Sequence, residues 1–191
     1  MDAPGFDPIH IRRVQAGDRE AFAPIVEAFG PAIHAFISRL IPDRETARDL
    51  TQETFLRAFV GIVRFDPTKP LAPWLHRIAL NLVRDRARSA RIRPEAQTGP
   101  DAVPDIEDTR ASDPADDLSE RQDRQAIRAA MGRLPAEYRE AVALRFFQDL
   151  SFAQVAAVLD TSEAAAKMRV YRGLERLQNI LGTRGNQTPK F

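Results

Sequence analysis

The sequence has no cysteine in its 191 residues, which excludes disulfides, thiolate zinc sites and cysteine nucleophiles and suits a reducing compartment. Its three histidines, His10, His34 and His76, are too far apart for the spacing of metal ligands. No apolar run approaches the roughly 20 residues that span a bilayer, and the first ten residues carry an early Asp and no apolar stretch, unlike a signal peptide. We therefore expect a cytoplasmic protein that needs no cofactor or metal and does not insert into a membrane.

The chain divides into three parts that differ in composition. Residues 11–93 and 118–182 are rich in helix-forming residues, with apolar side chains at helical spacing. Residues 94–117, between them, hold four prolines and eight acidic residues against one arginine, and such a segment buries too little apolar surface to fold alone. The sequence therefore predicts two small domains joined by a flexible acidic linker, with a disordered N-terminus at 1–10 and a polar tail at 183–191.

Helical periodicity dominates both domains, and no segment shows the alternation of a β-strand, so the expected fold class is all-α. Pro42 is expected to end one helix and Asp43 to cap the next, while Pro67, Pro70 and Pro73 enforce a loop. The expected helices lie near residues 11–28, 31–41, 43–62, 74–91, 118–132, 136–147, 151–159 and 162–181.

The last two expected helices resemble a helix-turn-helix. Ser151 and Gln154 have the spacing of a capping box, and Ser162 can cap the helix that follows the short break at Asp160. The last helix has one apolar face and a second face that carries Ala165, Met168, Arg169 and Arg172. A basic helix of this kind is typical of a recognition helix in the DNA major groove, although an amphipathic hairpin with a solvated basic face shows the same pattern.

A second basic face lies on the expected helix at 74–91. At 100° per residue, Arg77, Asn81, Arg84 and Arg88 fall on one stripe, opposite an apolar side. Guanidinium groups neutralise phosphates, and an Asn amide can read a base edge. Two aromatic residues stand next to this stripe and its proline-rich loop, Trp74 and Phe65. Aromatic rings stack on unpaired bases, so the stripe indicates a site for separated DNA strands. The alternative is that Trp74 anchors the core and the arginines form a solvated face.

The helix before it, near 43–62, has a polar face of a different kind. Its apolar residues predict one buried side, while Asp49, Gln52 and Glu53 fall on the opposite face. An acidic patch repels DNA and suits a basic protein surface. A face that is merely solvated has the same appearance.

Three segments together resemble the bacterial sigma factor family, in its small extracytoplasmic-function (ECF) branch. They are the segment 49–55, the segment Trp74–Asn81 with Asp85 and Arg88, and the stretch from Leu134-Pro135 to Arg172. The resemblance implies that Asp49, Gln52 and Glu53 bind the clamp helices of the largest subunit of core RNA polymerase. It also implies that the second domain binds the −35 element of promoter DNA through Lys167, Met168, Arg169 and Arg172.

For the first domain, the resemblance implies recognition and melting of the −10 element. Phe65, Asn81 and the loop at 66–73, which includes Lys69, would line a pocket for a flipped base, and Trp74 would support that loop. Arg77, Arg84 and Arg88 would hold phosphates of the separated strand. The chemistry would belong to the polymerase, so no catalytic residue is expected, and an anti-sigma factor, in some cases one at the membrane, is an expected partner.

The chain departs from the family pattern at the helix-turn-helix, where Asp160 stands at a common Gly position and Ala164-Ala165 replace Gly-Thr. Three other classes of protein remain open from the residues alone. A helix-turn-helix regulator would explain 118–182 without polymerase, and a sigma-like protein that only binds an antagonist would share every motif. An enzyme acting on nucleic acid is disfavoured, because no histidine cluster or paired carboxylates with metal-binding spacing are visible.

Overall fold

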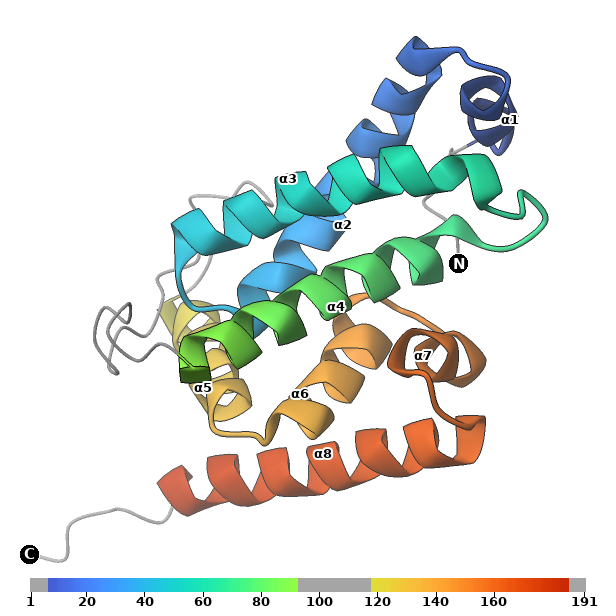
Figure 1. The fold of residues 1–191 in the computed structure, drawn as a ribbon. Coiled ribbons are helices and arrows are strands. Elements are labelled where there is room, and N and C mark those ends of the chain that lie inside the picture. Colours follow the sequence, from blue (N-terminus) through green and yellow to red (C-terminus); the bar gives the residue numbers. More distant parts are fainter. Residues whose placement is uncertain (1–6, 93–117, 186–191) are drawn as a thin grey trace, which may run out of the picture.

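The computed structural model describes residues 7–92 and 118–185, and throughout these ranges the ordered elements are helices. The expected acidic linker at 94–117 lies outside the described residues. In Figure 1 the first domain (blue to green) lies on the second (yellow to red). The predicted all-α class is therefore confirmed. The elements of the first domain are α1 (Ile9–Gln15), η1 (Arg19–Phe22), α2 (Ala23–Leu40), α3 (Arg44–Gly61), η2 (Ile62–Arg64) and α4 (Leu71–Ile92).

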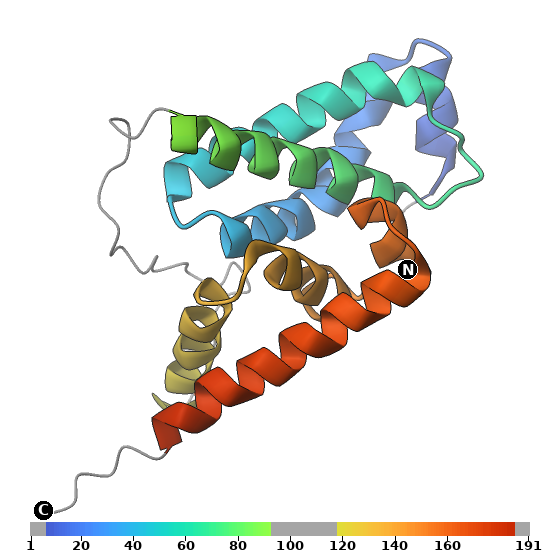
Figure 2. The same ribbon diagram turned by 60° about the horizontal axis from the view of Figure 1, so that its bottom comes forward.

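The second domain is built around the contact between its second and last helices. Its elements are α5 (Leu118–Gly132), α6 (Ala136–Val142), η4 (Ala143–Phe147), α7 (Phe152–Leu159) and α8 (Glu163–Gly185). The segment η4 is a π-helical turn that continues α6. Helix α8 packs along α6 and α7 and forms the long outer edge of the domain, as Figure 2 shows. The helix also extends past its expected end at residue 181, into the segment expected to be a polar tail.

Local capping explains three helix starts that the sequence predicts correctly. The Asp43 carboxylate accepts from Thr46 N at 2.7 Å at the start of α3. Ser151 and Gln154 form a full capping box, with bonds of 2.8 and 3.2 Å, before α7. Ser162 Oγ accepts from Ala165 N at 3.2 Å at the start of α8. Such caps satisfy amide groups that the first turn of a helix leaves without a partner.

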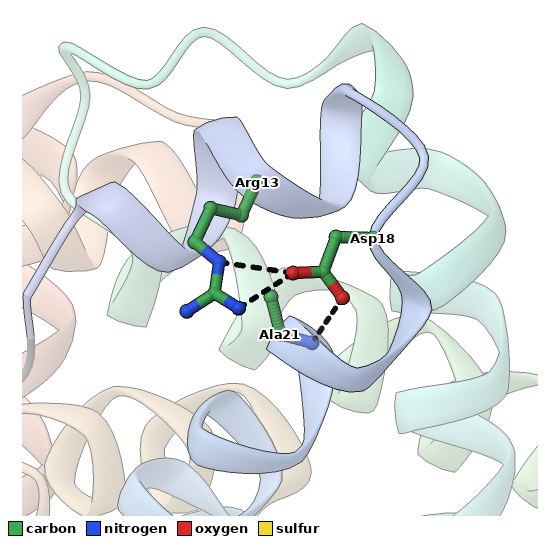
Figure 3. Close-up of polar contacts among 3 residues, drawn as sticks. All are labelled: Arg13, Asp18 and Ala21. Carbon is green, nitrogen blue, oxygen red and sulfur yellow. Dashed lines mark hydrogen bonds and ion pairs between the residues drawn. The ribbon is translucent and has the colours of Figure 1, made fainter.

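The N-terminal helices differ from the expectation in number and length. The expected helix at 11–28 is wrong: α1 already begins at Ile9 and ends at Gln15. Gly17 then turns the chain with φ of +99°, a conformation that glycine adopts without strain. Asp18 caps η1 by accepting from Ala21 N at 3.3 Å, and Arg13 donates to the same carboxylate at 2.6 and 2.9 Å (Figure 3). The break therefore has a local cause.

Two prolines do not stop helices where the sequence suggests. Pro31 lies inside α2, so the expected break after residue 28 is absent. Buried Phe29 and Ile33 flank it on one continuous apolar face, and their packing outweighs the lost hydrogen bond. Pro73 lies in the first turn of α4, which starts at Leu71 rather than at Trp74. A helix's first turn needs no amide donors, so proline is tolerated there.

Helix α2 is apolar enough to be compared with the expectation that no segment spans a membrane. The stretch Arg19–Leu40 contains an 18-residue window with mean hydropathy 1.3, which is long and apolar enough to cross a bilayer by composition. In the fold, 44% of this window is buried, and α2 packs against both α3 and α4. Ile25, Ile33 and Phe36 are fully buried. Residues 23–40 therefore form the central core helix of the first domain.

Helices α6 and α8 approach closely at Gly173, which gives a stability prediction. A Cβ at this position would lie 2.6 Å from Val142 Cγ2 and 3.3 Å from Tyr138 O. The Val142 side chain is buried and stiff, so we expect Gly173→Ala to lower the free energy of unfolding by about 1–3 kcal/mol, measured by urea denaturation. Gly182→Ala on the same helix is the control. It meets no atom within 4 Å and is expected to raise stability by about 0.5–1 kcal/mol.

Candidate functional site

The stripe expected on α4 is present, but its four residues have different surroundings. Asn81 is exposed. Arg88 is exposed too and pairs with Asp85 at 3.0 Å on its own helix. Arg84 and Arg77 instead pair with the second domain. Arg84 lies 2.6 Å from Glu140, and Arg77 lies 3.2 Å from Asp160. The apolar side of the helix, including Leu75 at 0% exposure, packs in the core as predicted.

The loop before α4 is fixed by aromatic packing and by an acidic side chain. The rings of Phe65 and Trp74 lie 4.8 Å apart, and Phe65 is only 9% exposed. Asp66 accepts from Thr68 N at 3.0 Å and from Thr68 Oγ1 at 2.7 Å. These bonds hold the pKa of Asp66 below its ordinary value. Phe65 and Trp74, on either side of the loop, therefore pack on each other, while Lys69 within it is exposed to solvent.

The polar face of α3 lies on the side of the helix away from the core. Asp49 and Gln52 are exposed, and Glu53 accepts from Arg57 Nε at 2.7 Å. The buried face consists mainly of Ala47, Phe55 and Ala58, as the sequence predicts. The three predicted residues therefore share one accessible surface of the first domain.

An apolar groove beside this face was not predicted. It lies between α2 and α3, has a volume of about 660 Å³, and is lined by Phe22, Val26, Gly30, His34, Arg48, Thr51, Gln52, Phe55, Leu56 and Phe59. Leu56 is 55% exposed, and Val60 and Val63 beyond it are 77% and 64% exposed. The i, i+4, i+7 spacing of these three residues was readable from the sequence as a second apolar stripe. Gln52 belongs to both the groove and the polar face.

The exposed face of α8 carries the residues expected to contact the −35 element. Lys167 and Arg172 are exposed, Met168 is 50% exposed, and Arg169 is partly buried. Lys167 Nζ lies 5.9 Å from the ring centroid of Tyr171, which is itself 50% exposed and was not predicted. The apolar face is buried through Ala166, Val170 and Leu177. The structure therefore presents cations, a thioether and an aromatic ring on one side of the helix.

His76 lies on α4 between the two domains and is 2% exposed. Its Nδ1 donates to Ala72 O at 2.8 Å, its Nε2 lies 3.2 Å from the Gln148 side-chain amide, and its ring meets Phe36 edge-on at 5.1 Å. Burial lowers the pKa of His76 below its ordinary value of 6.5, against the opposing effect of these two hydrogen bonds. The ring is therefore neutral in the folded chain near pH 7.

This burial predicts how stability depends on pH. Below about pH 6.5, His76 is protonated in the unfolded chain but stays neutral in the folded chain. The free energy of unfolding therefore falls as the pH decreases. The slope is at most about 1.4 kcal/mol per pH unit for one such group. Burial lowers the pKa of His34 too, whereas Asp18, Asp43 and Asp66 act only near or below pH 3.8. Urea unfolding at pH 7.5 and 5.5 measures the slope, and His76→Gln should reduce it; an equal slope in that variant would contradict the assignment.

Comparison with known proteins identifies both domains. The family model of Sigma-70 region 2 matches residues 25–92, and that of Sigma-70 region 4 matches residues 124–177. The chain is 30% identical to the ECF RNA polymerase sigma factor SigW of Bacillus subtilis, over 90% of this chain and 94% of SigW. It is 36% identical to the ECF sigma factor BldN of Streptomyces coelicolor, over 90% of this chain and 64% of BldN.

Solved structures agree with this result. CnrH, determined with the cytosolic domain of CnrY, is similar in fold with a TM-score of 0.70, at 24% identity, over 93% of this chain and 97% of CnrH. The sigma factor RpoE of Bartonella quintana, determined with the anti-sigma factor NepR, has a TM-score of 0.67 at 27% identity, over 84% of this chain and 96% of RpoE. The chain therefore belongs to the sigma-70 family of RNA polymerase sigma factors, in its ECF group.

Proposed function

We propose that this ECF sigma factor, an alternative initiation factor, divides its contacts between polymerase and DNA on adjacent helices of the first domain. Asp49, Gln52 and Glu53 on α3 bind core RNA polymerase, and Asn81 with the neighbouring arginines on α4 captures the opened −10 element. The observation that supports this division most is the contrast between two packed helices, one with an accessible acidic face and one with a basic stripe. The polymerase performs the chemistry, so the factor supplies binding energy and geometry.

The apolar groove between α2 and α3 extends the proposed polymerase contact. Its exposed Leu56 offers apolar area next to the polar side chain of Gln52. An amphipathic helix fits such a groove through a few apolar side chains, while its polar residues meet the charged rim. We assign this groove to the same partner as the acidic face.

The exposed face of α8 recognises the −35 element of the promoter in this proposal. Lys167, Arg169 and Arg172 contact the −35 element, with Met168 and the nearby Tyr171 shaping the surface. Binding by the two domains on one polymerase raises the effective concentration of each for its own DNA element. An anti-sigma factor is the proposed regulator, as in the structure of RpoE with NepR, and it acts on the sigma factor in the cytoplasm or holds it at the membrane.

Reconstitution tests this function. The purified chain is added to core RNA polymerase with fragmented genomic DNA, and run-off transcripts are sequenced. We expect transcripts that start at shared −10 and −35 sequences and are absent with core enzyme alone. A helix-turn-helix regulator would instead bind DNA tightly without polymerase and would give no transcript, which would overturn the proposal.

A further inference from the structure

The two domains of the free chain pack against each other through α4. Figure 2 shows α6 and α7 on the side of the first domain that α4 faces, and α4 contacts α7 directly. His76 of α4 meets Gln148 at this boundary, and Arg39 of α2 lies over the Phe147 ring with 4.4 Å to its centroid. The second domain therefore lies on the helix to which we assign −10 DNA binding.

The strongest polar contact of this boundary involves Arg84. Its Nη2 donates to Glu140 Oε2 at 2.6 Å and its Nε lies 3.3 Å from Glu140 Oε1, which is a two-pronged pairing. The Glu140 side chain is only 9% exposed. A buried carboxylate without a charged partner is unfavourable. Separating the domains would leave Glu140 without Arg84, so the pair stabilises the contact between them.

A second pair joins Arg77 to Asp160 at 3.2 Å. Asp160 ends α7 with φ of +54°, a left-handed conformation for which glycine is the usual residue. An aspartate at this position accepts some backbone strain and places a carboxylate opposite Arg77. Both side chains are largely exposed, at 48% and 81%, so this contact is weaker than the first and more sensitive to salt.

Both paired arginines belong to the stripe assigned to DNA phosphates, whereas Asn81 on the same stripe is exposed and Arg88 pairs only with Asp85 of its own helix. A guanidinium that donates its fork to a carboxylate cannot donate the same fork to a phosphate. We propose that the free chain is autoinhibited, with Glu140 and Asp160 occupying Arg84 and Arg77 in place of DNA phosphates. Promoter binding then requires the second domain to move off α4. This inference rests on the proposed role of α4 in −10 binding.

The test removes the acidic partners and leaves the DNA-binding residues intact. Glu140→Gln with Asp160→Asn is the test variant. Glu137→Gln with Asp149→Asn is the matched control, because Glu137 is exposed on the same helix and Asp149 has the same left-handed backbone, with φ of +52°. Asp160→Gly alone is a second variant that suits the local backbone. Since the chain lacks cysteine, Ser89→Cys and Gln178→Cys allow dye labels on the two domains.

Two quantities are measured on the full chain without polymerase. Energy transfer between the dyes reports domain separation, and fluorescence anisotropy reports affinity for a single-stranded oligonucleotide. We expect the test variant to show wider separation and about tenfold tighter binding, with a salt slope steeper by about 1.4, because each added phosphate contact contributes about 0.7 on a single strand. Asp160→Gly should shift both quantities in the same direction by less, and the control variant should match the wild type.

The inference is overturned if the test variant keeps the wild-type separation, if its affinity does not rise, or if the control shifts equally. Run-off transcription with core polymerase separates this failure from failure of the proposed function. If the wild type initiates at specific promoters while the test variant shows no wider separation of its two domains, only the autoinhibition is wrong. If no chain initiates, the proposed function itself is wrong.

Discussion

Asn81→Ala is expected to lower promoter opening by roughly tenfold or more while leaving polymerase binding unchanged. The Asn81 amide is the one uncharged polar side chain on the α4 stripe, and it is exposed. A side-chain amide that reads a base edge contributes about 1–3 kcal/mol. Alanine is a better helix former than asparagine, so the fold should not suffer. Permanganate reactivity of −10 thymines and run-off yield on a promoter found by reconstitution measure the effect.

The control for this prediction is Ser89→Ala, which removes another exposed polar side chain from the same helix. It should leave opening and run-off yield at wild-type levels. Wild-type permanganate reactivity in Asn81→Ala would show that the base-capture site lies elsewhere. Equal losses of polymerase binding and of opening would point to damage of the domain instead.

Glu53→Lys is expected to have the reverse effect, with polymerase binding weakened roughly thirtyfold, or by about 2 kcal/mol. The change places a cation on an acidic face that we assign to a basic partner surface. Its cost to folding is small, because the Arg57–Glu53 pair that it removes is exposed and spans one helical turn. Anisotropy of the labelled chain titrated with core polymerase measures the loss.

Glu20→Lys serves as the control for this charge reversal, since Glu20 is exposed on η1 and outside the polar face of α3. It should bind polymerase like the wild type. If both reversals weaken binding equally, net charge rather than the α3 face governs the contact. If neither does, Asp49, Gln52 and Glu53 do not form the polymerase site.

Features set by neighbouring residues could be predicted from the sequence, whereas features set by packing could not. The caps at Asp43, Ser151 and Ser162 depend on residues within one helical turn, and all three are present. Pro31 and Pro73 misled the prediction of helix ends, because burial of the flanking residues and position in the first turn decide whether a proline breaks a helix.

The candidate site divides in the same way. Periodicity placed Asn81 and Arg84 on one stripe of α4, because the side of a helix follows from spacing alone. Nothing in the spacing shows that Glu140, 56 residues away in the chain, pairs with Arg84. The groove beside Gln52 likewise requires two helices, and only its exposed Leu56 stripe is visible in one segment.

The π-helical turn at Ala143–Phe147 limits the insertions and deletions that this segment of the chain can accept. Such a turn holds one more residue than an α-helical turn, as if a single residue had been inserted without breaking the helix. Deleting one residue there would let α6 continue as a regular helix, but everything after it would rotate by about 100° around the helix axis. Helix α7 would then leave α4, and α8 would face a new direction. Single-residue gaps between relatives should therefore be rare in this segment.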